Sequence, residues 1–214
     1  MRGQEFIQGL REELRELNRR VEEHPFLTEA EKGILPKERL KLFVENQYYI
    51  VYHDLRSLAL MVTRASNPDE AEYFSKLQQG DLMAFQQLVK LGDELGVPFK
   101  GLSGLRILPA AVSYTHYLAW LGLYAGAAEQ VTALTVNLPV WGRACGRLAS
   151  SLVKNYNIKS TGFLDAFTHP PAWVEEEGVR IIERYLPDAE ERARSAARMI
   201  ESYELSFWDA VYSG

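Results

Sequence analysis

The sequence predicts an all-α protein, a bundle of about seven or eight helices. Apolar residues recur at spacings of three and four in several long segments, as they do on one face of a helix. No segment of useful length alternates apolar and polar residues in the manner of a half-buried strand. Proline, glycine and asparagine fall between these segments, at positions typical of helix ends.

The N-terminal part of the chain is expected to form three helices. The first covers Gln4–Glu23 and stops at His24-Pro25, because a residue before proline is disfavoured in the α conformation. A short helix follows from Thr28, where Glu31 three residues later makes a capping-box pattern, and Gly33 ends it. A long third helix runs from Pro36 to about Arg64.

The long third helix carries two rows of side chains on nearly opposite sides. One row is apolar and predicts the core face: Val44, Tyr48, Val51, Leu55, Leu58 and Val62. The other row mixes polar groups with an aromatic ring: Leu42, Asn46, Tyr49, His53, Arg56 and Leu60. Such a row is typical of a solvated face. It also fits a central helix of a bundle, with its second side on a pocket.

The middle of the chain predicts three more helices. One begins at Asn67-Pro68 and ends near Leu95, and the segment Val97–Gly104 reads as a loop. Between Ile107 and Gly142 only Glu129 is charged, but polar residues and prolines interrupt the run, so a membrane span is not expected. A buried pair is predicted instead, at about Pro109–Ala125 and Ala127–Tyr156.

Prolines determine two of the predictions for the later helices. Pro139 lies inside the second helix of the buried pair and should kink or divide it. A further helical region, Gly162–Tyr185, is broken by Pro170-Pro171. The last helix is expected to begin at a cap supplied by Asp188.

Size and composition favour one domain over residues 1–214, because the chain is too short for two well-cored domains. The net charge is −5 and no basic block stands out, so neither nucleic acid nor a membrane is expected as a partner. The N-terminus is charged throughout, unlike a secretory signal. The single cysteine, Cys145, fits a cytoplasmic protein. The four histidines form no close pair, and neither a metal nor another cofactor is predicted.

The last helix holds the first candidate for chemistry. Its apolar stripe includes Ile200, Phe207 and Val211, and Glu204 falls on that stripe. A carboxylate among core positions needs hydrogen-bond partners or a raised pKa, and such groups are often functional. The alternative is a glutamate that caps a neighbouring helix or pairs with an arginine.

Four segments resemble the TenA/thiaminase II family, within the heme-oxygenase-like group that also includes PqqC-type proteins. These segments are HPFLTEAEKGILPKERLKLFVENQYYI, AVSYTHYLAWLG, ALTVNLPVWGRACGRL and YELSFWDAVY, and they follow the family's order over nearly the whole chain. The resemblance implies a helical bundle with an aromatic-lined central pocket, assembled as a homotetramer. It also implies a small heteroaromatic ligand, a thiamin-related aminopyrimidine, and hydrolysis of that compound or cleavage of thiamin.

Carried over residue by residue, the resemblance assigns seven site residues. Glu204 takes the position of the family's catalytic glutamate. The positions of substrate-binding residues fall on Asn46, Tyr49, Tyr114, Arg143, Phe167 and Phe207. Asn46 stands where the family has an anchoring aspartate, and Arg143 where it has a tyrosine.

The family's nucleophilic cysteine falls at Pro139, which offers no nucleophile. Cys145 lies on another face of the same helix and is expected to be a packed core residue. Three functions follow from the resemblance: a variant hydrolase in thiamin salvage that uses water and Glu204, a non-catalytic binding protein, or a PqqC-like oxidase. The near absence of charge in Ile107–Gly142 adds an expectation of a homo-oligomer.

Overall fold

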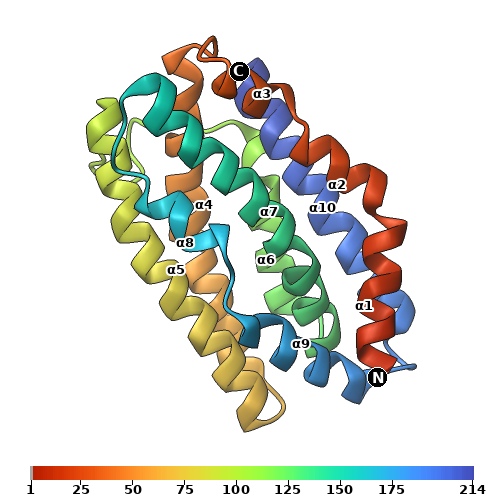
Figure 1. Ribbon diagram of the computed structural model, residues 1–214. Helices are drawn as coiled ribbons and strands as arrows, with labels where there is room; N and C mark the ends of the chain where they lie inside the picture. Colours follow the sequence, from red (N-terminus) through yellow and green to blue (C-terminus); the bar gives the residue numbers. More distant parts are fainter. Residues whose placement is uncertain (1) are drawn as a thin grey trace.

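The computed structural model describes residues 2–214, and helices make up most of it (Figure 1). The helices are α1 (Arg2–Glu13), α2 (Arg15–Glu22), α3 (Pro25–Glu31), α4 (Lys37–Arg64), α5 (Pro68–Leu95), α6 (Pro109–Tyr124), α7 (Ala127–Tyr156), α8 (Gly162–Thr168), α9 (Ala172–Tyr185) and α10 (Glu190–Ser213). Within residues 2–214 no β-strand forms, and the all-α prediction is confirmed.

The structure divides the chain more finely than expected, into ten helices within the described residues. The first predicted helix is two, because the backbone leaves helical geometry at Leu14. The next helix begins at Pro25 rather than Thr28, because the ring of His24 accepts the Phe26 N–H and supplies the cap. At the start of α10 no side chain forms a cap, so the role expected of Asp188 was wrong.

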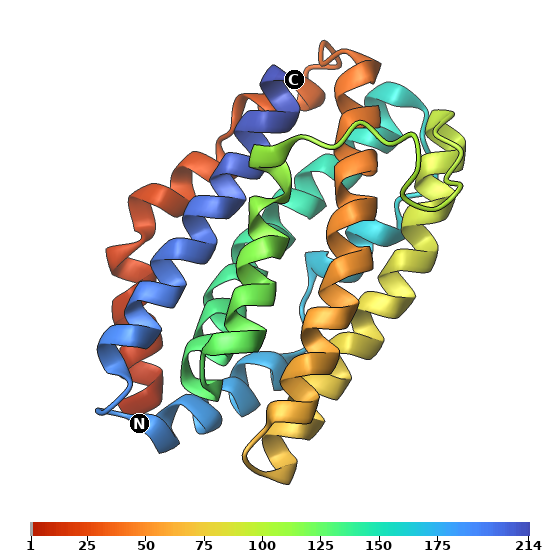
Figure 2. The same cartoon turned by 180° about the vertical axis from the view of Figure 1, so that it is seen from behind.

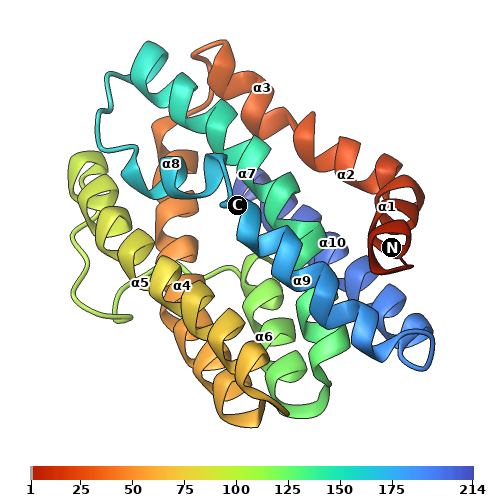
Figure 3. The same cartoon turned by 60° about the horizontal axis from the view of Figure 1, so that its bottom comes forward.

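The long helices form the body of the bundle. Helix α4 packs against α5 and α6, and α10 packs against α6 and α7. Figures 1 and 2 show α5 along one edge and the α1–α2 segment along the other, beside α10. Helix α9 packs against α7 and lies in the foreground of Figure 3. This arrangement leaves α4, α6, α7 and α10 facing a common interior.

Helix α7 is buried on most sides, which suits its long apolar sequence. It stays one helix through Pro139, so of the two expected effects, a kink or a division, the division does not occur. Two glycines let α8 approach closely. A Cβ added at Gly142 would lie 2.4 Å from the carbonyl oxygen of Phe167, and one at Gly146 would lie 2.9 Å from Thr168.

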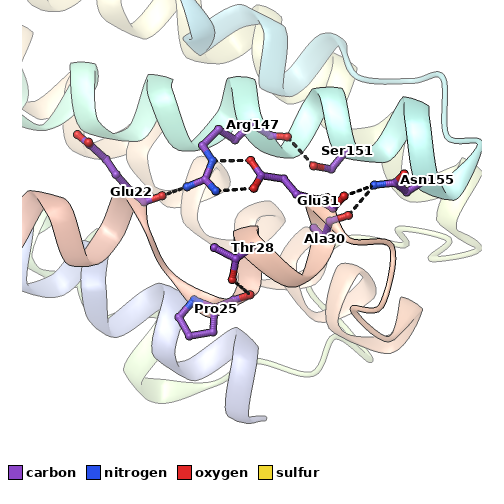
Figure 4. Close-up of polar contacts among 8 residues, drawn as sticks. All are labelled: Glu22, Pro25, Thr28, Ala30, Glu31, Arg147, Ser151 and Asn155. Carbon is purple, nitrogen blue, oxygen red and sulfur yellow. Dashed lines mark hydrogen bonds and ion pairs between the residues drawn. The ribbon is translucent and has the colours of Figure 1, made fainter.

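Polar contacts fasten α7 to the N-terminal helices (Figure 4). The Arg147 guanidinium makes two hydrogen bonds to Glu31, at 2.6 and 2.7 Å, and donates to the carbonyl of Glu22. The Asn155 amide donates to the carbonyls of Ala30 and Glu31, each at 2.9 Å. These bonds satisfy carbonyls at the ends of α2 and α3 that have no partner within their helices.

A cluster of aromatic rings fills the core between α3, α4, α7 and α10. Neighbouring ring centroids lie 5.3 to 6.2 Å apart among Phe26, Phe43, Trp141, Phe207 and Trp208. Most of these contacts are tilted or edge-to-face, which the charge distribution of aromatic rings favours. The cluster holds Trp208 and Trp141 rigidly, one beside Glu204 and one in the wall of the cavity described below.

In the part of the chain that the structure describes, no helix combines the length and the hydrophobicity that a bilayer crossing requires.

Candidate functional site

A cavity lies between α4, α5, α6, α7, α8 and α10. The centre of a water-sized sphere can occupy about 70 Å³ of this cavity. Its apolar walls come from Ile50, Val51, Leu58, Leu77, Leu118, Leu134, Leu138, Trp141, Phe167 and Phe207, and its polar groups are Gln47, Asp54, Asp81, Tyr114, Asn137 and Glu204. A mostly apolar concave site with a few converging polar groups is the usual form of a small-molecule site.

One group of polar side chains joins α6, α7 and α10. The Tyr114 hydroxyl donates to Asn137 Oδ1 at 2.9 Å, and the Asn137 amide donates to Glu204 Oε2. The indole N–H of Trp208 donates to Glu204 Oε1 at 3.3 Å. Glu204 therefore sits at the end of a chain of hydrogen bonds that fixes its orientation toward the cavity.

Glu204 is a buried acid with a strongly shifted pKa. Its side chain is 2% exposed, and burial raises its pKa to about 8 despite the hydrogen bonds from Trp208 and Asn137. One turn earlier on α10, Glu201 is 0% exposed and neither of its oxygens has a hydrogen-bond partner in residues 2–214. Burial, and then the charge of Glu204, raise the pKa of Glu201, and the Asn137 side chain acts against this rise.

A second group of polar side chains lies where α4 faces α5. Asp54 is 6% exposed and accepts a hydrogen bond from the Thr115 hydroxyl. Burial raises the pKa of Asp54 well above its usual value, and the nearby Asp81 adds to the rise. Asp81 is partly buried, and burial raises its pKa to about 7. Gln47 lies two turns before Asp54 on the same face of α4.

No cationic side chain and no thiol occur among the described residues that line the cavity. Cys145 is fully buried in the core, and burial raises the pKa of its thiol well above its usual value, as expected for a packed structural residue. Residues 2–214 also hold no group of three His, Cys, Asp or Glu side chains arranged to bind a metal.

Four of the seven site residues assigned from the sequence line this cavity. Tyr114, Phe167, Glu204 and Phe207 come from three helices and meet there. Their part in binding or catalysis stays a prediction.

The other three assigned residues lie elsewhere. Asn46 faces the segment of residues 96–108, which crosses α4 in Figure 2. Its amide donates to the Arg106 carbonyl at 3.1 Å and its oxygen accepts the Leu108 N–H at 2.9 Å, so its polar groups are already used. The Tyr49 hydroxyl lies 3.3 Å from the ring of His116, outside the cavity.

Arg143 lies on the outer side of α7, where it pairs with Glu22 at 2.5 Å. It follows Trp141 by two residues, about 200° around the helix, and therefore points away from the cavity. Pro139 also lies outside the cavity, where it borders a surface groove beside Arg143 and Val140.

Sequence reasoning missed Gln47, Asp54 and Asp81. The row of α4 that faces the cavity is one residue, about 100°, from the row that contains Asn46 and Tyr49. A usable signal was present, because Gln47 and Asp54 fall on the apolar stripe that contains Val51 and Leu58. The same argument that singled out Glu204 applies to them.

Comparisons with known proteins agree with this architecture. The model of the TENA/THI-4/PQQC family matches residues 11–214. An uncharacterized protein of Haemophilus influenzae is 28% identical over 113 residues, and the alignment spans about half of each chain, 53% of both.

Solved structures resemble this protein over nearly the whole chain. A TenA homologue from Pyrococcus furiosus is 26% identical, with a TM-score of 0.74 over 97% of this chain and 100% of that one. A TenA homologue from Pseudomonas syringae is 14% identical, with a TM-score of 0.81 over 97% and 92%. A putative TenA-like thiaminase from Sulfolobus solfataricus is 15% identical, with a TM-score of 0.70 over 96% and 95%.

The last two likenesses show the fold alone, which is the heme-oxygenase-like bundle that TenA homologues share. The family match covers α2 to α10 and with them all the cavity helices. The chain belongs to the TENA/THI-4/PQQC family.

Proposed function

We propose that this protein binds a small, flat, thiamin-related aminopyrimidine in the cavity and hydrolyses it with water as the nucleophile. The observation that carries the proposal is Glu204, a buried acid with a pKa of about 8 in the wall of an aromatic-lined cavity. We place the activity in cytoplasmic thiamin salvage, the role that the family resemblance implies.

The cavity supports a flat ligand of about one ring. The centre of a water-sized sphere can occupy about 70 Å³ of the cavity. If this region is compact, adding the sphere's radius of ~1.4 Å on all sides gives a cavity of roughly 260 Å³. The rings of Trp141, Phe167 and Phe207 supply flat apolar walls, which suit an aromatic ring. A single heterocycle with short substituents fits that space.

Glu204 supplies proton transfer in this proposal. At neutral pH a group with a pKa of about 8 is mostly protonated, so Glu204 is an acid that donates a proton to a ring nitrogen as charge develops there. The Tyr114–Asn137 chain and Trp208 hold its carboxyl in place. The carboxylate then accepts a proton from the attacking water, whose oxygen forms the new C–O bond as the C–N bond to the exocyclic amine breaks. The proton on the ring nitrogen passes to this amine, which leaves as ammonia.

The nucleophile is the point at which this chain departs from the cysteine-based chemistry of its family. Among the described residues lining the cavity none is a cysteine, and Pro139 offers no nucleophile. Water is a weaker nucleophile than a thiolate. We therefore expect turnover to be slow and independent of Cys145.

A second candidate is a binding protein without catalysis. The observation that favours it is the lining itself, which lacks a thiol, while both Glu204 oxygens already accept hydrogen bonds. In this version the cavity retains the aminopyrimidine and releases it unchanged.

One experiment separates the two candidates. The purified protein is incubated with thiamin and with its aminopyrimidine half carrying an exocyclic amine, and products are measured together with binding. Hydrolysis is expected for the wild type and for Cys145→Ala, with a loss of about 10²-fold or more in Glu204→Gln. Binding without turnover selects the binding protein. Brisk turnover that Cys145→Ala abolishes contradicts the site proposed here, and absence of binding contradicts both candidates.

A further inference from the structure

We infer that Gln47, Asp54 and Asp81 form a recognition site for a cationic group, so that the cavity selects flat ligands bearing a protonated amine or amidine. This inference deepens the proposed function and rests on it in one respect, since both place a ligand in the same cavity. It concerns the α4–α5 side of the cavity, away from the hydrogen bonds of Glu204.

Gln47 carries the first part of the argument. Its side chain is only 5% exposed and lines the cavity, yet it makes no hydrogen bond within residues 2–214. A largely buried amide without protein partners is costly, because only the small cavity is left to hydrate it. In native proteins nearly all such groups are paired. An amide aimed into a cavity therefore points to a ligand that completes its hydrogen bonds.

Asp54 and Asp81 carry the second part. Asp54 is only 6% exposed, and only its Oδ1 accepts a hydrogen bond, from Thr115. Within the described chain, its other oxygen and both oxygens of Asp81 have no hydrogen bond or ion pair. The pair thus presents three carboxyl oxygens without a protein partner to the cavity that Gln47 also lines.

The charge of the lining decides what these acceptors recognise. Three carboxyl groups line the cavity, and none of the lining side chains in residues 2–214 is cationic. An anion placed here would find no cationic partner and would keep these carboxyls protonated, whereas a cation would be stabilised by the carboxylates that form when they release protons. A planar group with two N–H donors also matches two carboxyl groups better than a point charge does.

Binding of a cation should release a proton from this pair. Burial raises the pKa of Asp81 to about 7 and raises that of Asp54 well above its usual value, so the empty cavity holds at least part of a proton there at neutral pH. The other ionisable groups facing the pair are Tyr114 from α6 and Glu204 from α10. Helix α8 contributes only Phe167, and α9 contributes no lining residue. A cation stabilises the charged carboxylates, so its affinity should rise as the pH increases through about 7.

The test compares two probes of the same shape, benzamidine and benzamide. Benzamidine is a planar cation over the neutral pH range, and benzamide is its uncharged counterpart. Calorimetric titration of the wild type at pH 7 should give tighter binding of benzamidine, by about ten- to hundredfold. Repeating the titration in phosphate and in Tris should give different heats, because the released proton is taken up by the buffer.

Variants make the test specific. Asp81→Asn changes a partly buried residue that makes no internal bond, so the fold should survive, and the preference for benzamidine should disappear. Asp54→Asn keeps an acceptor for the Thr115 hydroxyl and should act in the same direction. The matched control is Asp93→Asn, an exposed residue of α5 outside the cavity, which should keep the full preference.

Three results would overturn the inference: equal binding of both probes by the wild type, a preference that survives in Asp81→Asn and Asp54→Asn, or no benzamidine binding at millimolar concentration. Its failure is distinct from that of the proposed function. Aminopyrimidine turnover that depends on Glu204, without any preference for benzamidine, would retain the function and remove the cation site. A preference for benzamidine without aminopyrimidine binding would do the reverse.

Discussion

At the scale of single residues, Glu201 and Glu204 lie one turn apart on α10, but only the Glu204 carboxyl has hydrogen-bond partners. Glu204 accepts hydrogen bonds from Asn137 and Trp208, whereas both oxygens of Glu201 lack partners in the described chain. An unpaired buried polar group costs roughly 1–3 kcal/mol. Glu201 therefore lowers the free energy of unfolding.

The first prediction uses this contrast. Glu201→Met replaces an unpaired carboxyl with an unbranched apolar side chain and should raise the free energy of unfolding by about 1–2 kcal/mol. Glu204→Met is the matched change. It leaves the Asn137 amide and the Trp208 indole N–H unpaired and should lower stability by about 1–3 kcal/mol. Urea titrations of both variants check this, and a destabilising Glu201→Met would show that Glu201 has a partner or a structural role.

The second prediction concerns pH. The folded pKa of Glu204, about 8, lies above the ordinary 4.5 of an unfolded glutamate. Between these values the folded state holds a proton that the unfolded state has released, so stability is lost as the pH rises. Asp54 and Glu201 act in the same direction. His24, whose pKa burial lowers, acts oppositely only below 6.5.

The window from pH 6.5 to 8 isolates the raised acids. Each full proton contributes about 1.4 kcal/mol per pH unit, so the free energy of unfolding should fall by at least about 1 kcal/mol across it. Glu204→Gln, which cannot titrate, should show a shallower fall. Chemical denaturation at several pH values measures the slope, and a stability that rises with pH here would contradict the burial of these acids.

At the scale of elements, the contact between α7 and α8 sets one wall of the cavity. A Cβ at Gly142 would meet the backbone of Phe167, a lining residue, at 2.4 Å. Gly142→Ala should therefore push α8 away and destabilise the fold by about 1–3 kcal/mol, since overpacking costs energy of that order. Gly9→Ala in α1 has no atom within 4 Å of its Cβ and should stabilise the protein by about 0.5–1 kcal/mol.

Thermal unfolding of the two variants gives the comparison. Similar changes in both would mean that helix propensity, and not the close approach of α8, controls the effect. A ligand that binds the wild type should also bind Gly142→Ala more weakly, because Phe167 moves with α8.

The elements themselves were largely predictable, and the site was predictable only in part. Long helices with proline or glycine at their ends, such as α4 and α5, match their expected bounds closely. On α4 the cavity face was mistaken because this helix is buried on several sides, so its apolar period identifies no single inward direction. Glu204 stood out because α10 has one narrow apolar stripe. Tertiary packing decided which row of α4 faces the ligand.

At the scale of the whole molecule, α6 exposes an aromatic row that the described chain leaves uncovered. Trp120 is 49% exposed and Tyr124 71%, and their rings contact each other with centroids 5.9 Å apart. Exposed apolar clusters of this kind often mark association surfaces. We keep the proposal of a homo-oligomer, a tetramer by family resemblance.

Light scattering tests the assembly. The mass at micromolar concentration should be a multiple of 24.4 kDa, and Trp120→Glu with Tyr124→Glu should reduce it while circular dichroism stays helical. A mass of one chain for the wild type would reject the proposal.

The central claim is that the cavity between α4, α5, α6, α7, α8 and α10 is the ligand site. A crystal structure of the Glu204→Gln variant with the aminopyrimidine half of thiamin tests it most directly, because slow or absent turnover preserves the bound compound. We predict the ring between Trp141, Phe167 and Phe207, with its amino group toward Asp54 and Asp81 and a ring nitrogen toward residue 204. A ring bound outside this cavity, or an empty cavity at saturating ligand, would contradict the account.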